Sequence, residues 1–162
     1  MTATDEDTMV IELESGEVTI RLRPDLAPNH VARIKELVRD GFYDGIVFHR
    51  VMDGFMAQTG DPTGTGTGGS GQKLDAEFSP EPFVRGTVGM ARANHPNTGD
   101  SQFFICFDEA GFLNGQYTVW GEVTEGMEHI DQLKKAPKGS QSGQVEDPDA
   151  MVRVSIKADS DA

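Results

Sequence analysis

Short runs in which every second residue is apolar recur along this chain, and a period of two restricts it mainly to strands of an antiparallel sheet. The first run, "TMVIELESGEVTIRLRP", alternates over residues 9–13 and again over 18–22, with Ser15-Gly16 between them as a turn. One face of this hairpin is apolar and the other mostly charged. A half-exposed antiparallel sheet requires that arrangement.

Further segments have the composition of strands, and two have the period of a helix. The predicted strands cover residues 46–52, 55–58, 84–92, 102–107, 116–123 and 151–158. The predicted helices cover 28–40, which begins near a proline and ends at Gly41, and 123–135, which Thr124 could cap. Strands rarely alternate with helices, so a parallel sheet is disfavoured. A closed or nearly closed antiparallel barrel with helices over its ends hides the strand edges best.

We find no internal repeat and no linker, so residues 1–162 are expected to form one domain. Its core should span residues 9–158, with residues 1–8 and 159–162 as flexible acidic termini. The N-terminus has no basic region followed by an apolar run, and no stretch approaches the length of a membrane span. We therefore expect a cytoplasmic protein.

The composition is strongly acidic, with 27 Asp and Glu against 14 Lys and Arg and a net charge of −13. Such a surface repels phosphate groups, so neither nucleic acid nor an anionic membrane is an expected partner. The acids are spread along the chain and only six of the basic residues are lysine. This pattern favours a halophilic protein adapted to molar salt over an ordinary acidic surface.

Several functional motifs are matched only in part, because the flanking elements or spacings that they require are missing. Gly64, Gly66 and Gly69 match G-x-G-x-x-G, but no helix follows them, so a flexible surface loop is favoured over a dinucleotide site. The four histidines lie at no metal-ligand spacing, and Ser101 is not in a G-x-S-x-G elbow. Cys106, the only cysteine, lies in the apolar "QFFICF" and is expected to be inert. Neither a metal nor a cofactor is predicted.

One arginine has unusual neighbours. In "FHRVMDGFMAQTG", Arg50 lies among apolar residues with Asp53 as the one carboxylate nearby and Gln58 eight positions later. Long polar side chains recur in two other apolar runs, at Arg92 and Gln102. Core packing alone explains the apolar residues but not these polar ones.

These runs, "FHRVMDGFMAQTGD", "SQFFICF" and "FLNGQYTVWGEV", closely resemble the cyclophilin family of peptidyl-prolyl cis-trans isomerases. The resemblance extends from about Met9 to Ala158. It implies a mainly β fold, a closed eight-stranded antiparallel β-barrel capped by two α-helices. It also implies an enzyme that accelerates X–Pro rotation in protein folding, with proline-containing peptides and unfolded or folding proteins as partners.

The resemblance assigns roles to individual residues. Arg50 matches the catalytic arginine, which donates a hydrogen bond to the prolyl nitrogen in the twisted transition state, and Gln58 matches the glutamine that orients it. The positions that match substrate-binding residues are Phe55, Met56, Ala91, Arg92, Gln102, Phe104, Phe112, Leu113 and Tyr117. His49 should point to the opposite face of the strand and be structural, and Trp120 should lie in the core.

The sequence departs from the family at several of these positions. Phe112 stands where cyclosporin-sensitive members have tryptophan, and it lacks the indole N–H donor, so cyclosporin binding should be weakened. Tyr117 stands where many members have histidine, and Arg92 where many have asparagine. The stretch "ANHPNTGD" is one residue longer than in common eukaryotic members.

Two other functions compete with the isomerase. A non-catalytic peptide-binding chaperone or scaffold could use the same barrel, but it would not need both Arg50 and Gln58. A nucleotide-binding module on the glycine-rich loop would bind ATP or NAD, which we do not expect. Nothing in the sequence looks like a dimerisation helix, so a monomer is the default.

Overall fold

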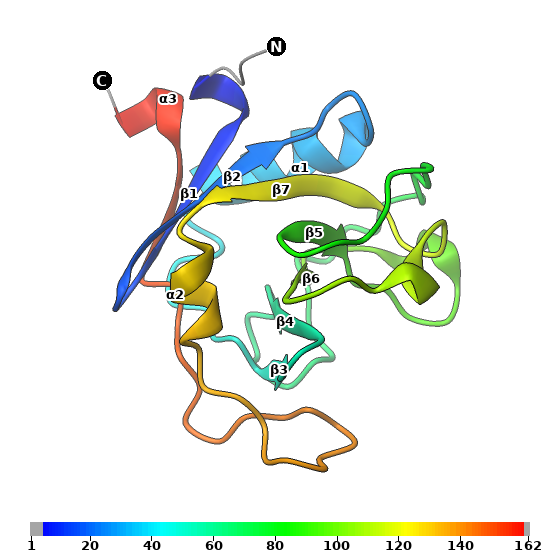
Figure 1. Ribbon diagram of the computed structural model, residues 1–162. Coiled ribbons are helices and arrows are strands. Elements are labelled where there is room, and N and C mark those ends of the chain that lie inside the picture. The colour runs from blue at the N-terminus through cyan, green and yellow to red at the C-terminus, as the bar shows by residue number, and fades with distance from the viewer. Residues whose placement is uncertain (1–4, 161–162) are drawn as a thin grey trace.

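The computed structural model describes residues 5–160, in which eight antiparallel strands form one strongly curled sheet (Figure 1). The order across the sheet is β3-β4-β6-β5-β7-β2-β1-β8. The strands are β1 (Thr8–Leu13), β2 (Gly16–Leu22), β3 (Arg50–Met52), β4 (Met56–Thr59), β5 (Thr87–Met90), β6 (Phe103–Cys106), β7 (Val119–Glu125) and β8 (Arg153–Ile156). The first hairpin is therefore confirmed.

Three α-helices and three 3-10 turns complete the described chain. The helices are α1 (Pro28–Arg39), α2 (Met127–Asp131) and α3 (Lys157–Ser160), and the 3-10 turns are η1 (Asp5–Asp7), η2 (Pro96–Thr98) and η3 (Gly111–Leu113). The apolar stripe of α1 is buried, and Pro28 opens the helix as predicted. Ile34 of α1 and Ile130 of α2 belong to the same large core cluster as the first hairpin.

The prediction of a closed barrel is wrong, because the sheet stays open. Its edge strands β3 and β8 do not pair with each other. The chain between α2 and β8 crosses this gap. It makes the isolated bridges Val47 to Ala150 and Arg50 to Gln144 and separate backbone hydrogen bonds to residues 45–51, but no continuous ladder. This crossing segment contains Pro137, Pro148 and two glycines, which interrupt a ladder, so it does not become a ninth strand.

The prediction of two helices also needs correction at the second helix and the C-terminus. The helix expected over 123–135 forms only over Met127–Asp131, because β7 continues to Glu125 and includes Thr124. Gly126 precedes the helix with a φ of 87°, and a β-carbon there would lie 2.2 Å from the Glu17 carbonyl oxygen. The strand expected over 151–158 ends at Ile156, where α3 begins.

The described parts of the two termini, which the sequence predicts to be flexible, form ion pairs with α1. Glu6 and Asp7 of η1 form ion pairs with Arg39 and Lys35, each at 2.8 Å, and Asp159 of α3 pairs with Arg39 at 3.0 Å. Figure 1 shows η1 and α3 beside each other at one end of the sheet. The other residues of the predicted tails, 1–4 and 161–162, lie outside the described residues.

Candidate active site

The site begins with a row of residues that the strand register sets opposite one another. Arg50 of β3 pairs with Gln58 of β4, and Gln58 pairs with Phe104 of β6. Residues directly opposite in a sheet point to the same face, so these three side chains share one surface. Their neighbours Val51 and Phe103 alternate to the opposite face and are fully buried in the large core cluster.

Phe104 belongs to a second, smaller apolar cluster behind this surface. Its ring stacks on Phe83 at 5.7 Å and meets Tyr117 edge-on at 5.6 Å. Opposite it on β5 is Gly89, where a β-carbon would come within 2.7 Å of both phenylalanine rings. The absence of a side chain at this glycine therefore makes the aromatic stack possible.

A cavity of about 120 Å³ opens between this cluster and the row of polar side chains. Its lining residues are Arg50, Phe55, Met56, Gln58, Ala91, Arg92, Phe104, Leu113 and Tyr117. The lining combines apolar and aromatic side chains with two cations and one amide. None of these nine residues is an acid, a histidine, a cysteine or a serine, so the lining offers no nucleophile or proton relay of the usual kind.

Neutral groups hold the guanidinium of Arg50. Its Nη1 donates to the Gln58 side-chain oxygen at 3.1 Å, its Nε donates to the Ser142 carbonyl at 3.0 Å, and its Nη2 faces the Met52 sulfur at 3.5 Å. Sulfur is a weak acceptor. These contacts fix the orientation of the guanidinium, and none of them neutralises its charge. Among them, Nη2 has no strong acceptor.

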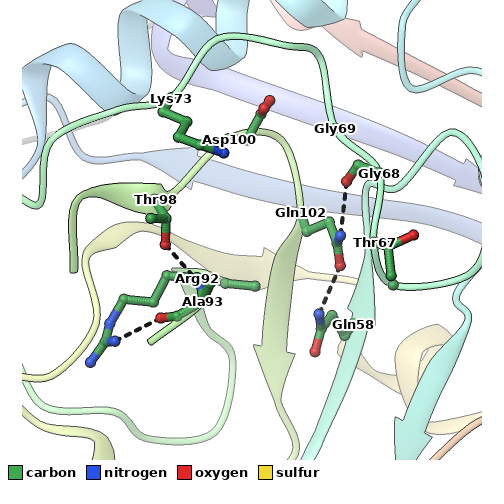
Figure 2. Close-up of a pocket in the computed structure, with 12 residues that line it drawn as sticks. Gln58, Thr67, Gly68, Gly69, Lys73, Arg92, Ala93, Thr98, Asp100 and Gln102 are labelled. Carbon is green, nitrogen blue, oxygen red and sulfur yellow. Dashed lines mark hydrogen bonds between the residues drawn. The ribbon is translucent and has the colours of Figure 1, made fainter. Parts of the chain in front are cut away.

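The hydrogen-bonded row continues past Gln58 into a second cavity (Figure 2). The Gln58 amide nitrogen donates to the Gln102 side-chain oxygen at 2.9 Å, and the Gln102 nitrogen donates to the Gly68 carbonyl at 2.9 Å. The second cavity has a volume of about 420 Å³. It shares Gln58, Ala91 and Arg92 with the first, so the two cavities adjoin, and together they are called the cleft.

Comparison with known proteins identifies the family. Residues 8–156 match the family model for the cyclophilin type peptidyl-prolyl cis-trans isomerase/CLD. The chain belongs to the cyclophilin family. The chain is thus a peptidyl-prolyl cis-trans isomerase of the cyclophilin type.

Relatives and solved structures support the family assignment. A "Probable peptidyl-prolyl cis-trans isomerase" of Brucella suis is 53% identical over 95% of this chain and 84% of the relative. A "Peptidyl-prolyl cis-trans isomerase" of Synechococcus elongatus is 44% identical over 80% of this chain and 88% of the length of that relative. A crystal structure of a cyclophilin from Hirschia baltica has a TM-score of 0.85 at 30% identity, covering 98% of this chain and 77% of that one.

A further solved structure similar to this chain is a Cryptosporidium parvum cyclophilin in the presence of the dipeptide Ala-Pro. It has a TM-score of 0.82 at 30% identity, and the similarity covers 92% of this chain and 98% of that one.

In this cyclophilin hydrogen bonds hold the glycine-rich loop, which the composition predicts to be a flexible surface loop. The Asp61 carboxylate accepts bonds from the amides of Thr63, Thr65 and Gly66 at 2.6–3.1 Å. Burial alone would raise the pKa of Asp61, but the bonds from the Thr63 hydroxyl and from loop amides hold it well below its usual range. The loop therefore forms a firm wall of the second cavity.

His49 lies beneath this loop, on the face opposite to Arg50. It is 5% exposed, and neither ring nitrogen has a hydrogen-bond partner within residues 5–160. Burial lowers the pKa of His49, partly opposed by the charge of Asp61. Gly66 of the loop lies over the imidazole, since a β-carbon there would be 3.6 Å from Nε2. His49 thus supports the loop and is separate from the proline cavity.

The structure places most of the predicted substrate-binding residues together. Gln102 lines the second cavity and not the first. Phe112 lines neither of these cavities and is 72% exposed, with its ring 5.5 Å from that of Phe55 at the rim. Trp120 and Cys106 are fully buried, and burial raises the pKa of the Cys106 thiol to about 12.

The sequence analysis missed part of the second cavity. The additional lining residues are Gly66, Thr67, Gly68, Gly69, Lys73, Ala93, Thr98 and Asp100. Most come from the glycine-rich loop. Its sequence was tested only against a nucleotide-binding motif, and no role in lining a peptide-binding cavity was predicted. Two acids could have indicated that this loop is ordered by specific contacts. Asp61 precedes the glycine-rich loop and Asp100 precedes β6, and both accept hydrogen bonds from amides of the loop.

The described part of the chain offers neither a metal-binding cluster nor a membrane-spanning helix. Among residues 5–160, no three or more His, Cys, Asp or Glu side chains are grouped in a way that could hold a metal ion. None of the helices in that range has the length and apolar character needed to cross a bilayer.

Proposed function

We propose that this cyclophilin accelerates X–Pro rotation by donating a hydrogen bond from the Arg50 guanidinium to the prolyl nitrogen. Rotation about the X–Pro bond breaks amide resonance, which sets a barrier of ~18–20 kcal/mol in amides generally. In the twisted transition state the prolyl nitrogen recovers a lone pair and becomes an acceptor. A donor aimed at that atom binds the transition state more strongly than either planar isomer, and this difference lowers the barrier.

The observation that carries this proposal is the environment of Arg50. Gln58 and Ser142 fix the guanidinium through neutral oxygens, so no carboxylate competes with the substrate for its charge. The cavity wall beside it is apolar, formed by residues such as Phe104 and Leu113. A hydrogen bond to an ionised donor is stronger where water is excluded.

The remaining lining residues give the cavity its selectivity for proline. A volume of about 120 Å³ suits a small ring, and the aromatic walls around Phe104 and Tyr117 provide apolar contacts for it. No bond is made or broken in this reaction, so the absence of a nucleophile among the nine lining residues is consistent with it.

Proline-containing peptides and folding proteins are the substrates that this site would take. The similar Cryptosporidium parvum structure in the presence of Ala-Pro supports binding of an X–Pro unit. Uncatalysed isomerisation takes ~10–100 s at 25 °C and can limit folding, so an isomerase of this kind would assist slow folding steps.

Exchange NMR on an Xaa-Pro peptide tests the proposal with the wild type and with Arg50→Ala, in dilute buffer and in molar KCl. We expect fast exchange with the wild type, and loss of most of the rate in a folded Arg50→Ala protein that still binds the peptide. A folded wild type that binds the peptide without accelerating exchange in either salt would show a binding module and overturn the proposal. Undiminished exchange in folded Arg50→Ala would overturn the role of the arginine.

A further inference from the structure

The second cavity lies where neighbours of a bound proline would pass. It shares three lining residues with the proline cavity and has more than three times its volume, at about 420 Å³ against about 120 Å³. An extended peptide advances ~3.3–3.6 Å per residue. A peptide with its proline beside Arg50 would therefore bring a side chain within a few residues of that proline into this cavity.

Two cations face this cavity without a carboxylate partner. Within residues 5–160, no ion pair joins either Lys73 or Arg92 to an acid. Five of the eight arginines in this chain of net charge −13 have such partners, and Arg92 is one of three, with Arg50 and Arg153, that have none within the described residues. Those five are Arg21, Arg23, Arg33, Arg39 and Arg85.

Carbonyl groups hold the guanidinium of Arg92 at the boundary between the two cavities (Figure 2). Nε donates to the Gln116 carbonyl at 2.9 Å, and Nη1 donates to the carbonyls of Ala93 and Asn94 at 2.9 and 3.1 Å. Figure 2 shows the bond to Ala93. The guanidinium carbon lies 4.7 Å from the centre of the Tyr117 ring. These neutral contacts fix the group in place and leave its charge uncompensated.

Asp100 is the one acid in the lining, and the glycine-rich loop already engages its carboxylate. One oxygen accepts bonds from the Ser70 amide at 2.7 Å and the Ser70 hydroxyl at 2.6 Å, and the other accepts from the Gly71 amide at 3.1 Å. Figure 2 shows Lys73 reaching over the same region from the loop. The lining thus carries two positive charges and one negative charge. The negative charge is the Asp100 carboxylate, which already accepts hydrogen bonds from the glycine-rich loop.

We infer that the second cavity is a subsite for an acidic side chain, glutamate or aspartate, close to the proline of a peptide substrate. The inference rests on the proposed isomerase function and adds the substrate class to it. A carboxylate would find a fixed guanidinium and an exposed ammonium there, and such charge-assisted hydrogen bonds are the stronger ones. The net charge of the protein repels acidic peptides at a distance, so the preference must come from these local contacts and not from steering.

The test uses one Xaa-Pro peptide with Glu, Gln or Lys placed in turn at each of three positions before and three after the proline. Exchange NMR gives kcat/KM for the wild type and for Lys73→Gln, Arg92→Gln and the control Lys134→Gln. The wild type should prefer Glu over Gln by about two- to fivefold at one or two positions, with Lys disfavoured there. The Glu to Gln ratio should fall in Lys73→Gln and Arg92→Gln but not in Lys134→Gln, which makes the same charge change beyond α2.

Several outcomes would overturn the inference. One is a wild type that treats Glu and Gln alike at all six positions, and another is a preference that persists undiminished in both cleft variants. If these occur while neutral peptides are still isomerised in an Arg50-dependent way, the proposed function stands and only the subsite is wrong. If no peptide is isomerised, the proposed function fails, and the Glu to Gln ratio of dissociation constants from NMR titration decides the subsite by itself.

Discussion

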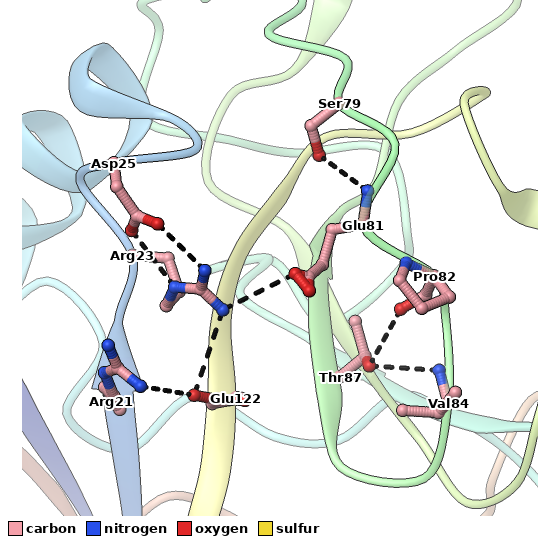
Figure 3. A network of polar contacts seen from close by, with 9 residues as sticks. All are labelled: Arg21, Arg23, Asp25, Ser79, Glu81, Pro82, Val84, Thr87 and Glu122. Atoms are coloured by element: carbon pink, nitrogen blue, oxygen red, sulfur yellow. Dashed lines mark hydrogen bonds and ion pairs between the residues drawn. The ribbon is translucent and has the colours of Figure 1, made fainter. Parts of the chain in front are cut away.

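Arg50 and Arg23 are both held by several contacts, but the chemistry of those contacts differs. At the proline cavity, Arg50 meets an amide oxygen, a backbone carbonyl and a sulfur. At the end of β2, Arg23 pairs with three carboxylates: Asp25 at 2.8 Å, Glu81 at 3.6 Å and Glu122 at 3.9 Å. Figure 3 shows this second network, which joins β2, β7 and the loop that precedes β5.

The difference shows how one residue type serves two purposes. The hydrogen bond to Asp25, with the charges of all three acids, raises the pKa of Arg23 and offsets the cost of its burial. The three acids neutralise the charge of Arg23, and its ion pair with Glu81 holds the segment around Glu81 in place. Two residues later, Phe83 stacks on Phe104 behind the proline cavity. The network therefore supports the site as structure, whereas the charge of Arg50 remains available to a substrate.

The largest expected effect is that of Arg50→Met on the rate. This variant keeps an apolar stem of similar length but removes the donor, and loss of one such transition-state donor costs about 10²–10³ in rate. Exchange NMR on an Xaa-Pro peptide should show this loss, while urea unfolding should show a stability close to that of the wild type. Arg50→Lys should recover little, since an ammonium cannot reproduce the planar contacts to Gln58 and Ser142.

Arg23→Met is the matched control for this prediction. It removes the same functional group from the carboxylate network and should lower stability while leaving the rate of folded protein near that of the wild type. If both variants lost the same fraction of the rate, the contrast between a reactive and a structural arginine would be disproved.

The resemblance to the cyclophilin family, carried by short motifs, predicted which residues gather at the site but not what surrounds it. Arg50 and Gln58 are eight residues apart and belong to one hairpin, so alternation alone places them on one face. The Arg23 network joins residues 99 positions apart in the case of Glu122, and no period in the sequence reports such a contact. Likewise, the charge of the second cavity depends on bringing Lys73 and Arg92 into the lining of one cavity, which only the folded chain shows.

The open edge of the sheet was missed for a related reason. Counting strands predicts how many there are, but closure depends on whether the segment before β8 can form a continuous ladder. The pattern predicts eight strands, and a closed barrel was inferred from that number although Pro137 and Pro148 lie in the segment before β8. Strand lengths were overestimated as well, since residues 46–49 and 84–86 were included in predicted strands but lie before β3 and β5.

A smaller effect is expected when Gln58, the residue between Arg50 and Gln102, is changed to leucine. Gln58→Leu removes the acceptor for Nη1 and should leave the guanidinium in place but less well oriented, at a cost of about tenfold in rate. Because the lost role is orientation, kcat should fall more than KM rises. The exposed Gln132→Leu serves as the control, and an equal loss of rate in both would argue against a positioning role.

Two buried histidines predict a dependence of stability on pH. Burial lowers the pKa of both His30 and His49, so each takes up its proton at a lower pH in the folded state than in the unfolded chain, where uptake occurs near pH 6.5. The unfolded state then binds more protons, and the free energy of unfolding should fall as the pH drops below about 6.5. The loss is at most about 1.4 kcal/mol per pH unit for each histidine.

The two histidines should not contribute equally to this dependence. Glu77 accepts a hydrogen bond from His30 and opposes the effect of burial. His49 has no hydrogen-bond partner in the described chain, and there the charge of Asp61 opposes burial while that of Arg50 reinforces it. Urea unfolding between pH 7.5 and 5 should therefore show a flatter profile for His49→Gln than for His30→Gln. Profiles of both variants that match the wild type would show that neither group is responsible.

The smallest effect concerns the salt dependence of the Arg23 network. Its partners are partly exposed, so Arg23→Met should cost about 1 kcal/mol of stability in dilute buffer. Raising the salt from 0.1 M to 1 M shortens the screening length from about 10 Å to about 3 Å, which should shrink this cost as measured by urea unfolding. The rate loss in Arg50→Met should persist in the same salt, because it comes from a contact beside an apolar wall. Equal salt sensitivity of the two effects would mean that Arg50, like Arg23, acts through long-range charge and not through a hydrogen bond to the proline.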